Sequence, residues 1–225
     1  MTGSQTQPRR RKRLLSNLLL IVVLLALAVL LLVMLASHRP EFYEQSLRRG
    51  PERLVQDAYD FSRKAQDFVS AVWSEKAFPL ELTEDEVNGY LAAANDDRLW
   101  RQLPLKFESW RKIFTSTTLR QVRVSFRDGR VTVAGQVTWR GSDLVLSLVG
   151  VPRIDSEGRA RLEVSAVRAG ALPVPRFLIR DLLDSIQNRP LPARSGRWRL
   201  VSVEVKDGKA TLLGEPKPRP ESSHD

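Results

Sequence analysis

The chain contains no cysteine and only two histidines, His38 and His224, among its 225 residues. Without cysteine there is no disulfide, no thiolate zinc site and no lipid attached to a cysteine. The lack of histidine between these two positions removes the most common general base and metal ligand from the body of the chain. Sequence motifs for a serine nucleophile, a dinucleotide or a phosphate-binding loop are also missing. These absences argue against an enzyme, and we predict no catalytic residue, no metal site and no cofactor.

One long hydrophobic run, residues 18–36, lies directly behind a basic cluster at residues 9–13. A helix rises about 1.5 Å per residue, so residues 14–36 reach roughly 34 Å, enough for a hydrocarbon core of about 30 Å. The apolar part of a signal peptide is shorter, about 7 to 15 residues, and ends at a small-residue cleavage site that this run lacks. We therefore predict a retained transmembrane helix over residues 14–36 rather than a cleaved signal peptide.

The charges on either side of this run predict its orientation. Residues 1–13 carry basic and no acidic side chains, whereas the segment after the run mixes both signs. The positive-inside rule then makes residues 1–13 a basic cytoplasmic tail. We therefore predict a protein that crosses the cell (inner) membrane once, with the bulk of the chain outside the cytoplasm. Residues 120–206 carry more basic than acidic side chains. Because this surface would lie outside the cytoplasm, it suits anionic lipid headgroups better than nucleic acid.

An amphipathic helix is expected after the anchor, within a helical stalk at residues 37–79. Its apolar positions alternate at spacings of four and three, and they are Leu54, Ala58, Phe61, Ala65, Phe68 and Val72. We favour packing of this stripe on the protein's own domain. The alternative is a short coiled coil in which Leu54, Phe61 and Phe68 mediate self-association.

The motif LTEDEVNGYL, residues 82–91, predicts the start of another helix. Thr83 with Glu86 three residues later is a capping box, and acidic side chains suit the positive end of a helix. The carboxylates of this motif therefore have a structural explanation, and we do not predict a catalytic role for them.

From residue 119 the hydrophobic period changes from 3.6 to 2, and Asp-Gly pairs at residues 128–129 and 207–208 predict two hairpins. The hairpins VSFRDGRVTVAG and VEVKDGKATLLG align without a gap, either as a true repeat or because Asp-Gly hairpins of β-forming residues look alike. We predict an α+β fold in which residues 80–214 form one curved antiparallel sheet, a half-barrel, packed on helices. Residues 215–225, rich in proline and charge, are expected to be a disordered tail.

A third strand, residues 144–151, is apolar on both faces, with leucines on one face and valines on the other. An amphipathic helix is expected at residues 176–187, and laid across the sheet it would create a groove for acyl chains with arginines at its rim. The candidate groove residues are Val145, Val149, Val151, Phe177, Ile179 and Leu183, and the candidate headgroup residues are Arg123, Arg161 and Arg180. The alternative is that both strand faces simply pack on helices.

The order of these motifs resembles that of a known family. A single N-terminal anchor, LTEDEVNGYL, alternating strands, GALPVP at residues 170–175 and a last Asp-Gly hairpin are similar to the YpmS-type envelope proteins and the LmeA-like phospholipid-binding domains of the tubular lipid-binding superfamily. The resemblance covers about residues 80–214. It implies an elongated half-barrel that holds lipid by apolar contacts, without catalytic residues. The long helix from Pro51 and the strongly basic second half depart from the family.

The function expected from these observations is a non-catalytic, membrane-anchored extracytoplasmic domain that binds phospholipid or another acyl-chain amphiphile. The alternative, from a different class, is a membrane-tethered protein-interaction or assembly module without a ligand.

Overall fold

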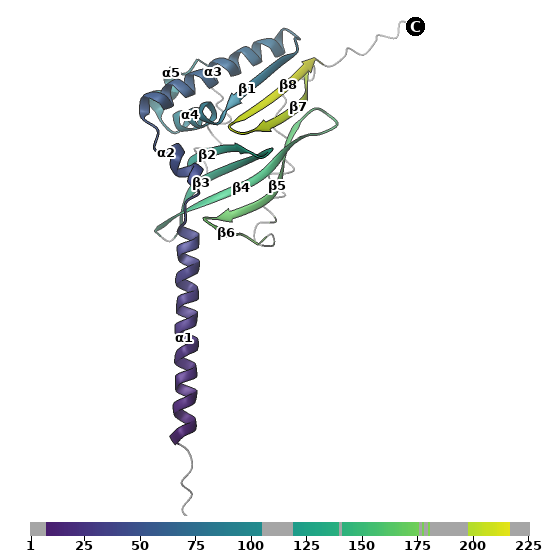
Figure 1. Ribbon diagram of the computed structural model, residues 1–225. Helices are drawn as coiled ribbons and strands as arrows, with labels where there is room; N and C mark the ends of the chain where they lie inside the picture. Colours follow the sequence, from purple (N-terminus) through teal and green to yellow (C-terminus); the bar gives the residue numbers. More distant parts are fainter. Residues whose placement is uncertain are drawn as a thin grey trace, which may run out of the picture.

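The fold is α+β, with helices and antiparallel strands grouped into layers (Figure 1). The computed structural model describes residues 8–104, 119–139, 141–175, 177, 180 and 198–216. Within these ranges the helices are α1 (Pro8–Ser37), α2 (Glu41–Leu47), α3 (Pro51–Trp73), α4 (Glu84–Ala94) and α5 (Asp97–Gln102). The strands are β1 (Phe78–Thr83), β2 (Arg120–Arg127), β3 (Arg130–Trp139), β4 (Ser142–Ile154), β5 (Ala160–Ala169), β6 (Leu172–Pro173), β7 (Trp198–Lys206) and β8 (Lys209–Pro216).

The strands form two sheets rather than the single half-barrel expected from the sequence. One sheet has the order β1-β8-β7 and the other, which is not closed, has the order β2-β3-β4-β5-β6. The two Asp-Gly hairpins lie in different sheets because β1, from far earlier in the chain, pairs with the outer edge of β8, with Leu80 opposite Leu212. In Figure 1 the five-stranded sheet lies between α1 and the layer formed by the three-stranded sheet, α3 and α4.

Both predicted hairpins are present. Asp128 and Gly129 have positive φ angles of 51° and 71°, as the favoured two-residue hairpin turn requires, and Arg127 pairs with Arg130 across the turn. In the last hairpin β8 continues to Pro216, which pairs with Trp198. The predicted start of the disordered tail at residue 215 was therefore two residues too early, because residues 215 and 216 belong to this strand. The remainder of that tail lies outside the described residues.

The predicted apolar stripe of α3 packs on the protein's own domain. Ala58, Phe61 and Ala65 are buried in a cluster with residues of β1, α4 and α5. The rings of Phe61 and Tyr90 lie 4.4 Å apart between centroids. Gly89 allows this close approach, since a Cβ atom there would lie 2.6 Å from the Cβ of Asp57.

Residues 41–73 therefore belong to the folded domain instead of forming a stalk between a membrane and a domain that begins at residue 80. Phe61 is only 4% exposed, so a self-association seam through this position would have to open the protein's own core. Leu54 and Phe68, the other two positions of the expected seam, are partly buried on the same helix.

Helix α1 extends away from the rest of the molecule (Figure 1). Among the residues whose side chains the structure describes, no single helix has the length and apolar character needed to cross a membrane. Two helical segments taken together are long and apolar enough to cross a membrane, by length and composition only. They are Val23–Ser37 and Glu41–Leu47, and the chain bends by 47° between them.

Candidate functional site

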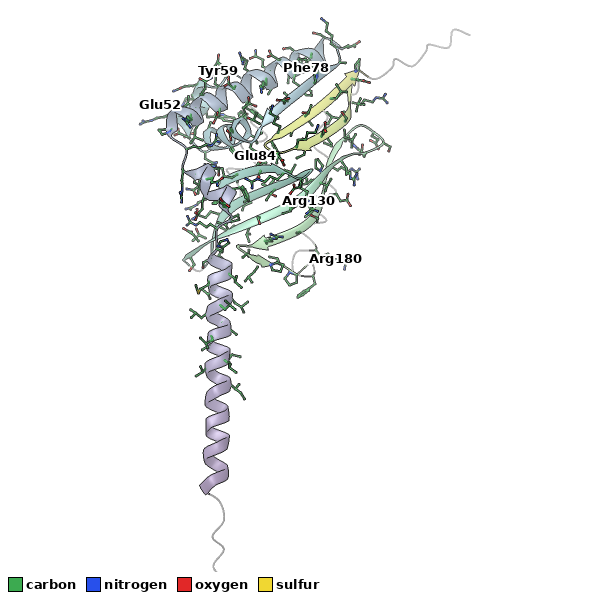
Figure 2. The ribbon with its side chains drawn as sticks, viewed as in Figure 1. Glu52, Tyr59, Phe78, Glu84, Arg130 and Arg180 are labelled. Atoms are coloured by element: carbon green, nitrogen blue, oxygen red, sulfur yellow. The ribbon has the colours of Figure 1, made fainter. Side chains whose placement is uncertain are left out.

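The acidic motif at the start of α4 has the structural role that the sequence predicted. Thr83 Oγ1 accepts a hydrogen bond from the backbone N–H of Glu86 at 3.2 Å, and Glu86 Oε2 accepts one from the N–H of Thr83 at 2.9 Å. Glu86 also forms an ion pair with Lys64 of α3 at 2.7 Å. Glu84 accepts a hydrogen bond from Ser125 Oγ at 2.9 Å (Figure 2), and Asp85 forms an ion pair with Arg49. Each carboxylate is thus held by a structural partner.

Asn88 of α4 pairs with β2, which is one of the two edges of the five-stranded sheet. Its Nδ2 donates to the carbonyl of Val124 at 2.8 Å, and its Oδ1 accepts from the N–H of the same residue at 2.7 Å. These are the two bonds that a neighbouring strand would make. Because an unpaired strand edge is a template for pairing with other chains, Asn88 protects β2 from such contacts. The sequence did not indicate this role.

The strand β4 has two different faces, as predicted. Cross-strand partners share a face, so Val145 lies beside Gln136, and Ser147 lies on the same face beside Ala134. Val145 is 3% exposed and packs with Tyr43 of α2 and Ala134. It is therefore core and not an open groove wall, because α2 covers this end of the sheet.

Two of the other predicted groove residues, Val149 and Val151, alternate onto the same face as Val145 but are only partly buried. Phe177 is 78% exposed. Ile179 and Leu183 lie outside the described residues. The described part of the chain therefore brings the three valines onto one face of the sheet. Val145 is packed under α2, whereas Val149 and Val151 are less covered.

Arg123 was predicted to lie at a solvated rim, and the structure instead buries it. Its side chain is on the face of β2 that α2 covers, the residue is 5% exposed, and Nη1 donates to the carbonyl of Val122 at 2.8 Å. In the part of the chain that the structure describes, Nε has no hydrogen-bond partner. Burial lowers the pKa of the guanidinium, and the nearby Tyr43 acts in the opposite direction. The alternation rule failed here because β2 is buried on both faces, by α4 on one side and α2 on the other.

Arg161 and Arg180 are exposed, as predicted for headgroup residues. Arg161 forms an ion pair with Asp155 at 3.0 Å, and Arg159 contacts the same carboxylate at 3.0 Å. The backbone N–H of Arg159, with smaller contributions from its side chain and the N–H of Glu157, lowers the pKa of Asp155 to about 2. Arg161 is therefore already partnered. Arg180 lies on the side of the five-stranded sheet from which α1 leaves (Figure 2).

Among the described residues, no three side chains of His, Cys, Asp or Glu gather to hold a metal ion. No family model matches this chain, and no curated protein matches it. The resemblance to the YpmS-type and LmeA-like proteins therefore rests on its short motifs alone and stays a prediction.

Proposed function

We propose that this protein is a single-pass membrane protein whose folded domain lies outside the cytoplasm, directly at the bilayer surface, and binds a phospholipid or another acyl-chain amphiphile without catalysis. The observation that carries the proposal is the exposure of α1. Large hydrophobic side chains between Ile21 and Met34 are 47% to 65% exposed. A helix of a soluble domain buries one apolar face, whereas a helix that is apolar all round needs lipid or protein around it.

The end of α1 is attached to the domain, which supports a location close to the membrane. The backbone N–H of Ala171 donates to the carbonyl of Leu35 at 2.9 Å. Gly170 packs so closely on α1 that a Cβ atom there would lie 2.4 Å from the carbonyl oxygen of Ala36. Because this turn between β5 and β6 contacts the helix end, the five-stranded sheet would rest beside the headgroups. The exposed Arg39 and Arg168 flank this junction and suit anionic lipid.

Two features favour an amphiphile over a protein partner. Val149 and Val151 continue an apolar strand face beyond the part that α2 covers, which supports contact with acyl chains. The interaction-module alternative relied on the stripe of α3, but Phe61 is used in the protein's own core. The motif resemblance to phospholipid-binding envelope domains points in the same direction.

The proposed topology predicts where the two ends of the chain lie. A periplasm-dependent reporter fused after Asp225 should be active, because the positive-inside rule keeps the residues before Leu14 in the cytoplasm. An N-terminal tag should stay on a full-length protein in the membrane fraction. Reporter activity only on the cytoplasmic side, or a shortened protein in the soluble fraction, would contradict the topology.

The proposed ligand predicts a loss of bound lipid when Val149 and Val151 are both changed to threonine. The hydroxyl groups should weaken contact with acyl chains, while these partly buried positions should leave the melting temperature nearly unchanged. Mass spectrometry of organic extracts from the full chain, purified in a maltoside detergent, measures the lipid per protein. Val201→Thr, an exposed valine of β7, is the matched control and should retain lipid. Equal lipid in all three proteins, or none in the wild type, would reject amphiphile binding at this face.

A further inference from the structure

A buried arginine of β2 and a buried tyrosine of α2 meet where this helix packs on the five-stranded sheet. Arg123 lies beside Ala134, which lies beside Ser147, so these residues form a row across β2, β3 and β4. Arg123, Ala134 and Ser147 are all at least nine-tenths buried, and Tyr43 of α2 is fully buried against this part of the sheet. Neither Arg123 Nε nor the Tyr43 hydroxyl has a hydrogen-bond partner among the described residues.

The positive charge of Arg123 has no counterion in the described part of the chain. No described carboxylate forms an ion pair with it, and among the described titratable groups Tyr43 is the one that acts on its pKa. An arginine keeps its proton in proteins, so the charge persists when the side chain is buried. A buried charge without a partner is strongly destabilising, and such groups are normally paired. The fold therefore maintains an unfavourable cation that an anion would neutralise.

We propose that Arg123 of β2 and Tyr43 of α2 form the anion-binding site of this domain, which receives the phosphate group of the amphiphile's headgroup between the two side chains when α2 lifts away from the sheet. This inference rests on the function proposed above and specifies its ligand as an anionic, phosphate-bearing amphiphile. A guanidinium and a phenol both donate hydrogen bonds, and arginine is the side chain best suited to phosphate oxygens.

The surroundings of the pair fit an anionic ligand with acyl chains. Burial raises the pKa of Tyr43, and the positive charges of Arg123 and Arg39 oppose that effect, so a second cation acts on the same hydroxyl. Asp143 is the one carboxylate near Tyr43 in the described residues, and its Oδ1 accepts a hydrogen bond from Thr138 at 2.8 Å. Val149 lies on the sheet face of Ser147, two residues further along β4, where an acyl chain would follow the headgroup.

Entry to the site requires α2 to move, because this helix presses Tyr43 onto the part of the sheet that holds Arg123. This helix has only seven residues and no side-chain hydrogen bond at its N-terminal cap, and it lies between Pro40 and Gly50. A short helix without a side-chain cap can open locally at a lower free-energy cost than the long helices and central strands of a fold. Its position immediately after α1 would place this opening next to the bilayer.

The test is a titration of the full chain, purified without lipid in an uncharged maltoside detergent. The ligands are dihexanoyl phosphatidylglycerol, uncharged dihexanoylglycerol and inorganic phosphate. Binding is measured by calorimetry, and the heat of titrating each ligand into protein-free micelles is subtracted. The wild type should bind the phosphatidylglycerol at least tenfold more tightly than either of the other ligands. Arg123→Gln should remove this preference, Arg123→Lys should keep part of it, and Tyr43→Phe should reduce it.

Arg63→Gln is the matched control, since Arg63 is an exposed arginine of α3 that is paired with Asp60, and it should bind as the wild type does. Equal preference for phosphatidylglycerol in wild type and Arg123→Gln would overturn the inference and leave the proposed function standing, whether or not that variant melts earlier. Binding of inorganic phosphate as tight as that of phosphatidylglycerol would overturn the headgroup assignment in favour of a soluble phosphate. No binding of either lipid by the wild type would reject both proposals.

Discussion

Replacing Phe61 by alanine is expected to lower the free energy of unfolding by about 3–5 kcal/mol, the usual loss for a large aromatic side chain removed from a core. Phe61 packs on Tyr90 at 4.4 Å between ring centroids and belongs to the cluster that joins α3, α4, α5 and β1. The cavity would lie between two helices held close by Gly89, which limits how far they can collapse. Chemical denaturation of the full chain in detergent, followed by tryptophan fluorescence, measures the loss.

The control for this change is Tyr59→Ala on the same helix. Tyr59 is half-exposed, and surface substitutions usually change stability by less than about 0.5 kcal/mol. The loss at Phe61 should not depend on protein concentration, because the side chain is buried within one chain. A loss that disappears on dilution would restore the coiled-coil alternative, in which the stripe of α3 joins two copies.

Replacing Asn88 by alanine is expected to lower the free energy of unfolding by about 2–6 kcal/mol, because two buried backbone groups lose their partner and each costs about 1–3 kcal/mol. The variant would leave the N–H and the carbonyl of Val124 unpaired beside α4. Hydrogen exchange should become faster at the Val124 amide first, since its acceptor is the side chain removed.

Asn95→Ala is the matched control, because Asn95 also donates to a backbone carbonyl, that of Leu91, but lies at the exposed end of α4. It should change stability by about 1 kcal/mol or less. The Asn88 variant should also aggregate more readily than the control, because it opens the edge of β2. Equal stability of the two variants would show that Asn88 does not hold this edge.

The sequence alone determined those features that depend on a few neighbouring residues. Asp128-Gly129 specified a hairpin because its tight turn needs positive φ angles that these residue types tolerate. Thr83 and Glu86 specified the start of α4 because a capping box satisfies backbone donors within one turn. The stripe of α3 indicated which face would be buried, since helical periodicity requires only local geometry.

The tertiary structure decided which of several possible partners each element received. Local alternation could not show that β1 would pair with β8 and divide the strands into two sheets, because that pairing joins residues far apart in the chain. It also could not show the register shift at Val149 and Gly150, where Ser165 is left between paired residues and the alternation of β5 is broken.

The same reason explains the revised candidate site. Arg123 and Val145 looked like a solvated rim and an open wall because alternation assigns a face to a side chain but not what covers that face. Helix α2 covers both residues, and its position depends on the end of α1 and on the ion pairs of Arg49 with Asp57 and Asp85. Side-chain burial is therefore a property of the assembled layers, and here it changed an expected surface arginine into a buried charge with no ion-pair partner among the described residues.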